Sequence, residues 1–549
     1  MTAASRRPAP AALLFFAGMA VLHSWPLASD PARLARLDNH DAELNTWIVA
    51  WVAHILPRDP LSLFEAPILY PETHSLAFSE HMFVPSLMGA PLLWAGASPV
   101  LVYNLLIIAG LALSGWSMYL LMRRWTGSES AGIIAGLIYA FNAHVLTRFV
   151  HLQAHHVEFF PLVLYAFDRV LAERRLRDVL LLSFAFVLQA LCSNYLLVFT
   201  SYALLAAAVV RWPELAARKQ RATPEAPDGG GNPFLGLPAG RLLVAGIIAV
   251  ILLSPFLWPY YEVSRDQGLV RGVSDVAQYN ATWRDYLATG GRLHYAWWSQ
   301  RFYEGRITLF PGMTALVLAA VAVMSQRAIR DPRVRMAIAI GAVGVAFSFG
   351  TSLPGYAFFH EYLPLLSGLR NVARWGWLPL AAIAILAGFG ASILETRTWR
   401  YAPIALGLLV TAEAIRAPVG FTTVYEIPRI YDRFRTASDI VIAEFPFYSG
   451  ADVSQNGPYV YANTRYFKPL LNGYSSFHPD TFEARGRALN SFPSETALAE
   501  LRVAHVTHVL VHTQAFSRRY GREALSAIDT IPELHFETEE DGIRLYRLK

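Results

Sequence analysis

The feature that most constrains this fold is a series of apolar stretches, each long enough to cross or nearly cross a lipid bilayer. A helix that crosses the hydrocarbon core needs roughly 20 apolar residues. The chain is 54% hydrophobic and 16% charged, whereas soluble domains carry about 25% charged residues. These values exclude an ordinary soluble globular protein and a disordered chain. We expect a polytopic α-helical membrane protein with about eleven transmembrane helices. The predicted spans are residues 10–27, 99–122, 131–149, 157–170, 179–193, 195–210, 242–261, 308–324, 336–350, 375–393 and 402–415.

Arginine residues gather in alternate connections between these stretches, and this asymmetry predicts how the chain crosses the membrane. Connections rich in Lys and Arg remain in the cytoplasm. Residues 81–95 would break the alternation if they crossed, so we expect an interfacial or half-inserted helix there. The chain is therefore predicted to be a multi-pass protein of the inner (plasma) membrane with a cytoplasmic N-terminus. The basic groups are Arg6 and Arg7, Arg123 and Arg124, and those within 174–177, 211–241, 327–335 and 397–400.

Three segments then lie on the non-cytoplasmic side. Residues 1–420 are predicted to form a transmembrane module with outer loops at 28–80 and 262–307, and residues 421–549 a small extracytoplasmic α/β domain. The pattern in this tail predicts strands at 439–445, 506–512 and 542–548, and a helix at 494–503.

Other classes of function lack their sequence signatures. The net charge is +5 without a dense basic cluster, so no nucleic-acid partner is expected. The single cysteine, Cys192, lies in an apolar run, and no Gly-x-x-x-x-Gly-Lys loop for ATP occurs.

The first outer loop is the most informative part of the sequence. Leu44, Ile48, Trp51 and Ile55 recur at helical spacing, which predicts an amphipathic helix on the membrane surface with Trp47 and Trp51 at the interface. Acidic residues precede and begin this helix, where the helix dipole favours carboxylates. Capping is therefore the alternative to a catalytic role for them.

The loop resembles that of the GT-C class of membrane glycosyltransferases. The resemblance rests on the motifs DAELNTW at 41–47, LFEAPILYP at 63–71 and LAFSE at 76–80. The predicted architecture is also similar to that of the class: a first span, an acidic outer loop, about eleven spans in all and an outer C-terminal domain. The resemblance implies transfer of a sugar from a polyprenyl-phosphate donor to a saccharide, lipid or protein acceptor.

The resemblance further implies that a loop carboxylate is the catalytic base. An acceptor hydroxyl needs a base to remove its proton as the bond to the anomeric carbon forms. Asp41 and Glu43 are the candidates, separated by Ala42 where better-known members have an adjacent Asp-Glu pair. We expect Asp41 to be the base in an inverting displacement.

Outer arginines are the candidates for binding the donor phosphate. Arg370 and Arg374 lie four residues apart and would share one face of a helix that began early enough. Arg301 and Arg306 follow Trp297 and Trp298, so arginine and aromatic rings could bind phosphate and isoprenoid together. Ordinary anchoring at the membrane interface is the alternative for all four.

Four further residues are candidates for binding the substrate. Glu80 and His81 close the third motif, and His151 and His155 share one face if their segment is helical. The histidine spacing is also compatible with a divalent metal, although the His-Glu-x-x-His arrangement is absent. Whether a metal is used stays open.

Two other functions are alternatives to glycosyl transfer. A transporter or flippase of lipid-linked saccharides would need ionisable residues in mid-membrane, where Arg148, Asp168 and Glu413 are the few examples. A non-catalytic assembly factor would act through its outer tail alone.

Overall fold

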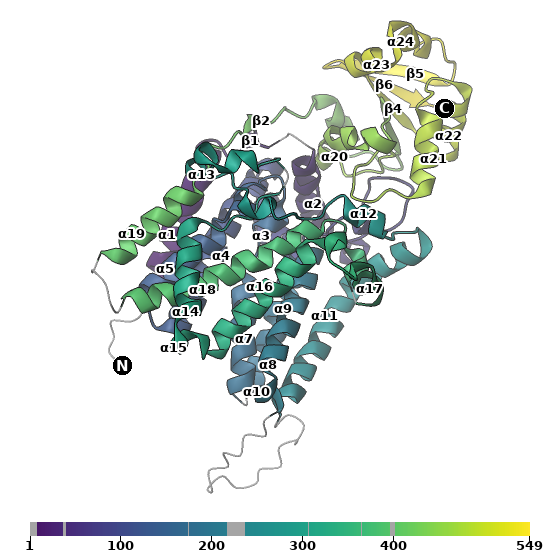
Figure 1. Ribbon diagram of the computed structural model, residues 1–549. Helices are drawn as coiled ribbons and strands as arrows, with labels where there is room; N and C mark the ends of the chain where they lie inside the picture. The colour runs from purple at the N-terminus through teal and green to yellow at the C-terminus, as the bar shows by residue number, and fades with distance from the viewer. Residues whose placement is uncertain are drawn as a thin grey trace. The chain divides into compact units, whose positions relative to one another are not determined.

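The computed structural model describes residues 8–36, 40–173, 175–216, 237–305, 307–363, 365–395 and 401–549 (Figure 1). The chain divides into two compact units. Unit 1 comprises Met1–Ser29, Leu105–Pro255 and Val270–Val419, and unit 2 comprises Asp30–Asn104, Phe256–Leu269 and Gly420–Lys549.

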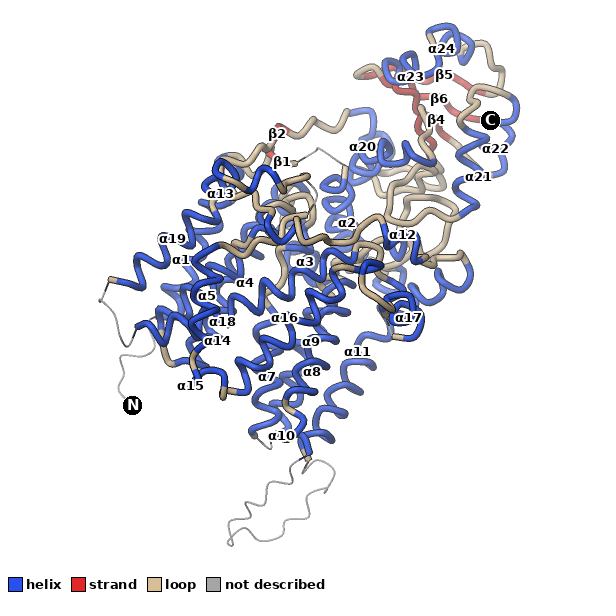
Figure 2. The backbone as a smooth tube through the Cα atoms, viewed as in Figure 1, coloured by secondary structure: helices blue, strands red, loops and turns tan. Residues whose placement is uncertain are grey.

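Unit 1 is built mainly from helices (Figure 2). Each of the predicted apolar stretches contains a helix, while their number as membrane spans stays a prediction. Among the described residues, three helices are long and apolar enough to cross a membrane: Pro99–Thr126, Pro238–Asp266 and Val372–Glu395. The helices are α1 (Pro8–His23), α5 (Glu129–Ala140), α6 (Ala143–Leu146), α7 (Phe159–Ala172), α8 (Leu176–Ala190), α9 (Asn194–Val210), α10 (Trp212–Ala216), α12 (Val273–Ala277), α13 (Arg292–Trp297), α14 (Met313–Met324), α15 (Gln326–Ile329), α16 (Pro332–Ser348), α17 (Tyr356–Tyr362), α18 (Trp377–Glu395), α19 (Ala402–Ala414) and most of α4 (Pro99–Thr126) and α11 (Pro238–Asp266).

Helix α18 is the centre of unit 1 and packs against α5, α14 and α16. Small residues let these backbones approach closely. A Cβ atom added at Gly390 would lie 1.9 Å from the Leu318 carbonyl oxygen of α14, and one at Gly344 of α16 would lie 2.4 Å from the Pro379 side chain. Both positions therefore require glycine for packing.

A buried ion network joins α7 to the end of α9 and to α16. Asp168 accepts from Arg211 at 2.5 Å and from Arg333 at 2.9 Å, and Arg211 also pairs with Glu214. Each charge is thus paired within the protein, which is what makes burial of charge tolerable. The side chain of Asp168 has a structural role.

Unit 2 combines the first outer loop with the tail. Its four-stranded sheet has the order β3-β4-β6-β5; β3 and β4 are parallel, and the other pairs are antiparallel. A separate two-stranded pair joins β1 to β2, linking residues near 35 to residues near 422. The elements are β1 (Leu34–Ala35), α2 (Asp41–Ile55), α3 (Phe83–Trp94), β2 (Thr422–Thr423), β3 (Ile442–Phe445), α20 (Gly457–Ala462), α21 (Asp480–Leu489), α22 (Glu495–Val503), β4 (His508–His512), α23 (Thr513–Tyr520), α24 (Arg522–Ile528), β5 (Leu534–Glu540) and β6 (Ile543–Leu548).

Helix α2 occupies the predicted residues, but its placement on a membrane surface is wrong. Trp47 is fully buried, and Trp51 is nearly so. The helix packs against α3 and α20, and the Trp47 indole donates to the Asn463 side chain at 3.1 Å. One of these partners, α20, comes from the tail of the chain. The apolar spacing therefore belongs to a core helix and not to an interfacial one.

The segment at 81–95 forms α3, which has 12 residues. At 1.5 Å per residue such a helix is about 18 Å long, which is too short for a hydrocarbon core of about 30 Å. Residue Ala90 is buried, whereas Leu92 and Trp94 are exposed.

Candidate functional site

The acidic motif of the first loop lies at the N-terminus of α2, inside unit 2. Asp41 is the first residue of the helix and is partly exposed. The Tyr474 hydroxyl donates to one oxygen of Asp41 at 2.5 Å. This contact fixes the orientation of the carboxylate, as a catalytic base requires.

Glu43 occupies a different environment. Its side chain is 3% exposed, and one oxygen lies 2.5 Å from His40 Nδ1. The Tyr425 hydroxyl donates to the other oxygen, also at 2.5 Å. The hydrogen bond to Glu43 raises the pKa of His40, while burial and the same carboxylate raise the pKa of Tyr425. Both oxygens of Glu43 are therefore engaged inside the unit.

A cationic pocket lies within unit 1. Arg148, Arg374, His144, His151 and Gln153 contribute polar groups, and none of its described lining residues is acidic. The enclosed cavity is small, about 30 Å³, which is about the room for one or two water molecules. Paired guanidinium groups in a partly buried setting bind phosphate oxygens. Apolar residues complete the wall: Ala154, Val157, Leu196, Phe199 and Trp377.

Arg374 enters this pocket from a 3-10 turn, Val372–Gly376, and not from an α-helix. The guanidinium lies over the Tyr195 ring, 4.4 Å from its centre. Arg370 precedes the turn and lies over the Tyr279 ring at 5.1 Å. The expectation that the two arginines share one helical face is wrong, because α18 begins only at Trp377.

Neither Arg370 nor Arg301 lines the cationic pocket. Arg301 ends a short 3-10 helix, its side chain is exposed, and its carbonyl oxygen accepts from Arg284 at 3.0 Å. Arg306 lies outside the described residues.

His151 and His155 also differ from the prediction, because their segment is a 3-10 turn at Leu152–Ala154 and not an α-helix. His151 lines the cationic pocket. His155 is fully buried, its Nδ1 lies 3.2 Å from the His151 carbonyl oxygen, and its ring packs on Phe149. Among the described residues, no three His, Cys, Asp or Glu side chains converge as metal ligands, so we derive no step through a metal.

Glu80 and His81 lie at the start of α3 in unit 2. Glu80 is half-buried. His81 is 1% exposed, its Nδ1 accepts from the Phe83 backbone at 3.1 Å, and its ring packs against Phe64. The environment of His81 is that of a core residue.

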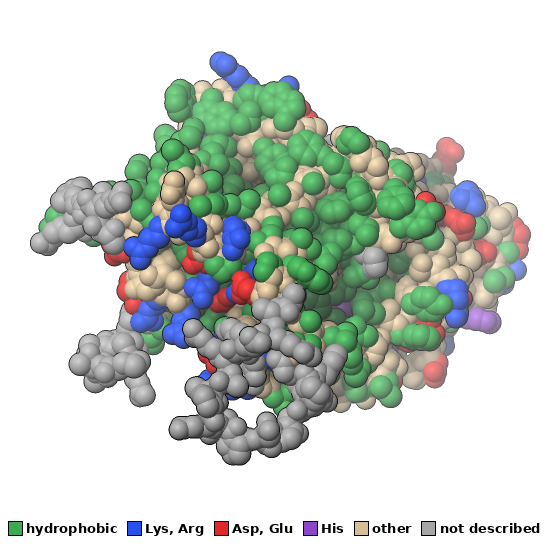
Figure 3. All heavy atoms as spheres, turned by 60° about the horizontal axis from the view of Figure 1, so that its bottom comes forward, with side chains coloured by type: hydrophobic (Ala, Val, Ile, Leu, Met, Phe, Trp, Pro, Cys, Tyr) green, Lys and Arg blue, Asp and Glu red, His purple; other side chains and the backbone are tan. Residues whose placement is uncertain are grey.

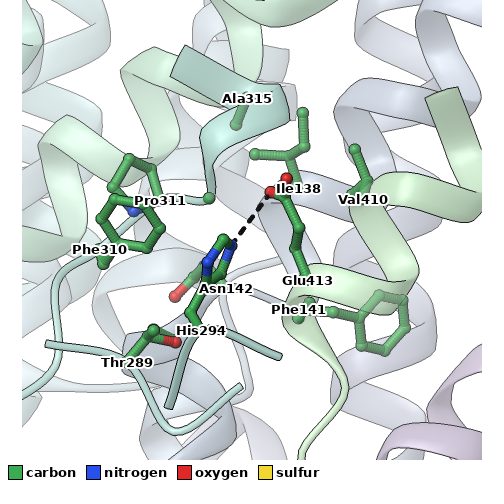
Figure 4. A pocket seen from close by; sticks show the side chains of 13 residues that line it. Ile138, Phe141, Asn142, Thr289, His294, Phe310, Pro311, Ala315, Val410 and Glu413 are labelled. Atoms are coloured by element: carbon green, nitrogen blue, oxygen red, sulfur yellow. Dashed lines mark ion pairs between the residues drawn. The ribbon is translucent and has the colours of Figure 1, made fainter. Parts of the chain in front are cut away.

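A second pocket of unit 1 surrounds Glu413 (Figure 4). The carboxylate accepts from the Thr314 backbone at 3.1 Å and from its hydroxyl at 2.8 Å, so it caps α14. The His294 ring points toward it, with Nε2 at 3.7 Å (Figure 4). Gly312 has φ +98° and lies so close that an added Cβ would be 2.8 Å from Glu413. The ionisable group at the end of α19 thus holds two helices together.

The predicted residues are divided between the two units. Asp41, Glu43, Glu80 and His81 belong to unit 2. The predicted residues of unit 1 are Arg301, Arg370, Arg374, His151 and His155. Within unit 1, Arg374 and His151 share a pocket. The sequence interpretation missed several residues of these sites: Tyr425, Tyr474, His144, Gln153 and Tyr195. The sequence interpretation noted Arg148 only as a charged residue in an apolar stretch and did not assign it to a binding site.

Comparison with known proteins gives a match in structure only. No family model matches the chain, and no curated protein matches its sequence. The structure is similar to the mycobacterial arabinofuranosyltransferase AftD, with a TM-score of 0.59 at 15% identity over 100% of this chain. The chain spans 40% of the length of AftD.

Two other solved structures have lower scores. The oligosaccharyltransferase AglB of Archaeoglobus fulgidus gives 0.48 at 12% identity, covering 98% of this chain and 74% of that one. ArnT of Cupriavidus metallidurans gives 0.34 at 12% identity, covering 98% of both chains. All three neighbours have the GT-C fold of membrane glycosyltransferases. The likeness to AftD shows that this chain has that fold.

Proposed function

We propose that the protein is a membrane glycosyltransferase that moves a sugar from a polyprenyl-phosphate donor to a hydroxyl acceptor on the outer face of the membrane. The observation that carries the proposal is the cationic pocket, where Arg148 and Arg374 lie beside the apolar wall of Phe199 and Trp377. Arginine side chains beside apolar ones match the two parts of a phosphate joined to an isoprenoid chain. The fold shared with AftD, an arabinofuranosyltransferase, supports the same class of reaction.

The reaction is a single displacement. The acceptor oxygen forms a bond to the anomeric carbon, the bond from that carbon to the phosphate oxygen breaks, and the configuration inverts. The electron pair of the broken bond stays on the polyprenyl phosphate, whose charge Arg148 and Arg374 stabilise. The proton of the acceptor hydroxyl passes to Asp41.

The choice of Asp41 follows from the two carboxylate environments. Tyr474 orients Asp41 at the start of α2, whereas Glu43 is nearly fully buried between His40 and Tyr425. The proposal requires that the Asp41 carboxylate comes within hydrogen-bond reach of the acceptor hydroxyl when donor is bound.

The contacts of two ionisable residues weigh against transport. Asp168 is paired with Arg211 and Arg333, and Glu413 caps α14 through Thr314. Both carboxylates hold helices together, so neither is available to bind an ion or substrate that crosses the membrane.

Arg374→Ala tests the donor site. In lipid nanodiscs, polyprenyl phosphate should bind about 10- to 100-fold more weakly to this variant, because a charge-assisted hydrogen bond is worth about 1.5–3 kcal/mol. Arg301→Ala, which removes an exposed arginine, is the matched control and should bind as the wild type does.

Sugar transfer is measured on the same samples with a panel of polyprenyl-phosphate sugars. We expect transfer by the wild type and by Arg301→Ala, and its loss in Arg374→Ala. Wild-type binding and transfer in Arg374→Ala would refute the donor site. If a variant without sugar-transfer activity still performed the role of the protein in the cell, the assembly-factor alternative would be favoured.

A further inference from the structure

An apolar groove runs along the surface of unit 1 between α4 and α7. The walls are formed by Leu113, Trp116 and Leu120 of α4 and by Leu162 and Tyr165 of α7. These five side chains are half-buried, so the groove is open along its length. Trp116 is held in place because its indole donates to the Ala9 carbonyl oxygen of α1 at 2.9 Å.

The two ends of the groove carry opposite charges. Arg124 lies at one end and Glu158 at the other. Arg124 is exposed and has no ion-pair partner in the part of the chain that the structure describes, whereas its neighbour Arg123 pairs with Glu129 at 2.5 Å. Glu158 is buried and lies 3.0 Å from His156 Nδ1. An anionic group is therefore attracted to the Arg124 end and repelled from the other.

The length of the groove matches one leaflet of a bilayer. Leu113 and Arg124 are separated by eleven helical steps, or about 16 Å along α4. The hydrocarbon core is roughly 30 Å thick, so the groove has the depth of one acyl chain. Because α4 is long and apolar enough to cross the membrane, its arginine-bearing end lies at the level of lipid headgroups.

Other arginines gather at the same end of unit 1, where the labels α8, α10 and α15 lie in Figure 1. Figure 3 brings this face forward and shows Lys and Arg side chains grouped among hydrophobic ones. Exposed arginines at these helix ends are Arg175, Arg177, Arg327, Arg330 and Arg335. Such a surface attracts anionic lipids. Of the arginines that the structure describes, Arg124 is the one that lines the apolar groove.

We propose that this groove binds one anionic phospholipid of the bilayer, with its phosphate on Arg124 and an acyl chain between α4 and α7. The lipid is a structural ligand, separate from the cationic pocket around Arg374. A zwitterionic lipid carries the same phosphate, but its ammonium group is repelled by Arg124, so an anionic lipid binds more tightly.

The test measures lipid retained on the intact protein. Wild type and variants are purified from nanodiscs made of phosphatidylcholine with a minor fraction of phosphatidylglycerol, and native mass spectrometry counts the bound lipids. Arg124→Gln removes the cation, and Leu120→Trp fills the groove. Arg177→Gln removes an exposed arginine of α8 outside the groove and is the matched control.

We expect the wild type and Arg177→Gln to retain one phosphatidylglycerol, and Arg124→Gln to bind it about 10-fold more weakly, as loss of one charge-assisted hydrogen bond implies. Leu120→Trp should lose the lipid while keeping Arg124. Equal retention by all four proteins would overturn the proposal. Retention of phosphatidylcholine in equal measure, or of polyprenyl phosphate in place of phosphatidylglycerol when both are supplied, would also overturn it.

Discussion

Replacing Glu43 with Gln should destabilise unit 2 without removing the catalytic base. The carboxylate accepts from Tyr425 and pairs with His40, both at 2.5 Å. Gln keeps an acceptor for Tyr425 but loses the negative charge. A hydrogen bond to a charged group contributes about 1.5–3 kcal/mol, and the His40 pair contributes less because His40 is 24% exposed.

A loss of about 2 kcal/mol of unfolding free energy is the expected result. For domains of about 150–250 residues, each kcal/mol shifts the unfolding midpoint by about 2–4 °C, so Glu43→Gln should unfold about 4–8 °C below the wild type. Thermal unfolding of the purified protein in nanodiscs, followed by tryptophan fluorescence, measures the shift. Asp59→Asn, an exposed carboxylate of the same unit, is the control.

The pH dependence gives a second check on the same contact. Because the pKa of His40 is raised in the folded protein, its charged form stabilises the fold fully below its ordinary pKa of about 6.5, and this contribution fades as pH rises through the raised value. The difference between wild type and Glu43→Gln should therefore shrink at alkaline pH. An unchanged midpoint combined with a loss of transfer of 100-fold or more would show that Glu43 is the base.

Other consequences concern packing, pH and the helix network. Burial, helped by Arg58 and Lys468, lowers the pKa of His54 to about 4, so unit 2 should lose stability as pH falls from about 6.5 to about 4; His54→Phe should flatten this slope in urea titrations at several pH values. Gly390→Ala should abolish accumulation of folded protein, since its Cβ would lie 1.9 Å from the Leu318 carbonyl oxygen, whereas Gly246→Ala, with nothing within 4 Å, should express normally; equal yields would contradict this packing. Asp168→Asn should lower the unfolding midpoint because Arg211 is left buried with one fewer partner, and an unaltered midpoint would count against the network.

The helices and tail strands could be predicted from local sequence patterns. The alternation at 506–512 contains β4, and that at 542–548 contains β6. Strand β5 was missed because its side chains are largely exposed, so its sequence lacks the alternation of a half-buried strand. Eleven apolar stretches each contain a helix, because apolar runs of this length bury best as helices in a membrane.

The environment of α2 could not be predicted, because part of its cover, helix α20, comes from far along the chain. The spacing of Trp47 and Trp51 is the same for an interfacial helix and for a core helix. The hydrogen bond from Trp47 to Asn463, a residue more distant in the sequence, identifies α2 as a core helix. The contact between Tyr474 and Asp41 likewise could not be predicted from any local sequence pattern.

The pocket around Arg374 was predictable only in part. Arginines on the outer side of a span were visible in the sequence, but their spacing suggested a helical face that the 3-10 turn at Val372–Gly376 does not provide. The partners Arg148 and His144 come from another segment. Their convergence depends on how unit 1 packs.

The most direct test of the central claim is the rate of sugar transfer by Asp41→Asn at saturating donor. The account predicts that this variant binds polyprenyl phosphate as the wild type does and transfers sugar about 10²- to 10⁴-fold more slowly, the usual loss when a general base is removed. Asp59→Asn should transfer at the wild-type rate. Transfer by Asp41→Asn at the wild-type rate would contradict the assignment of Asp41 as the base.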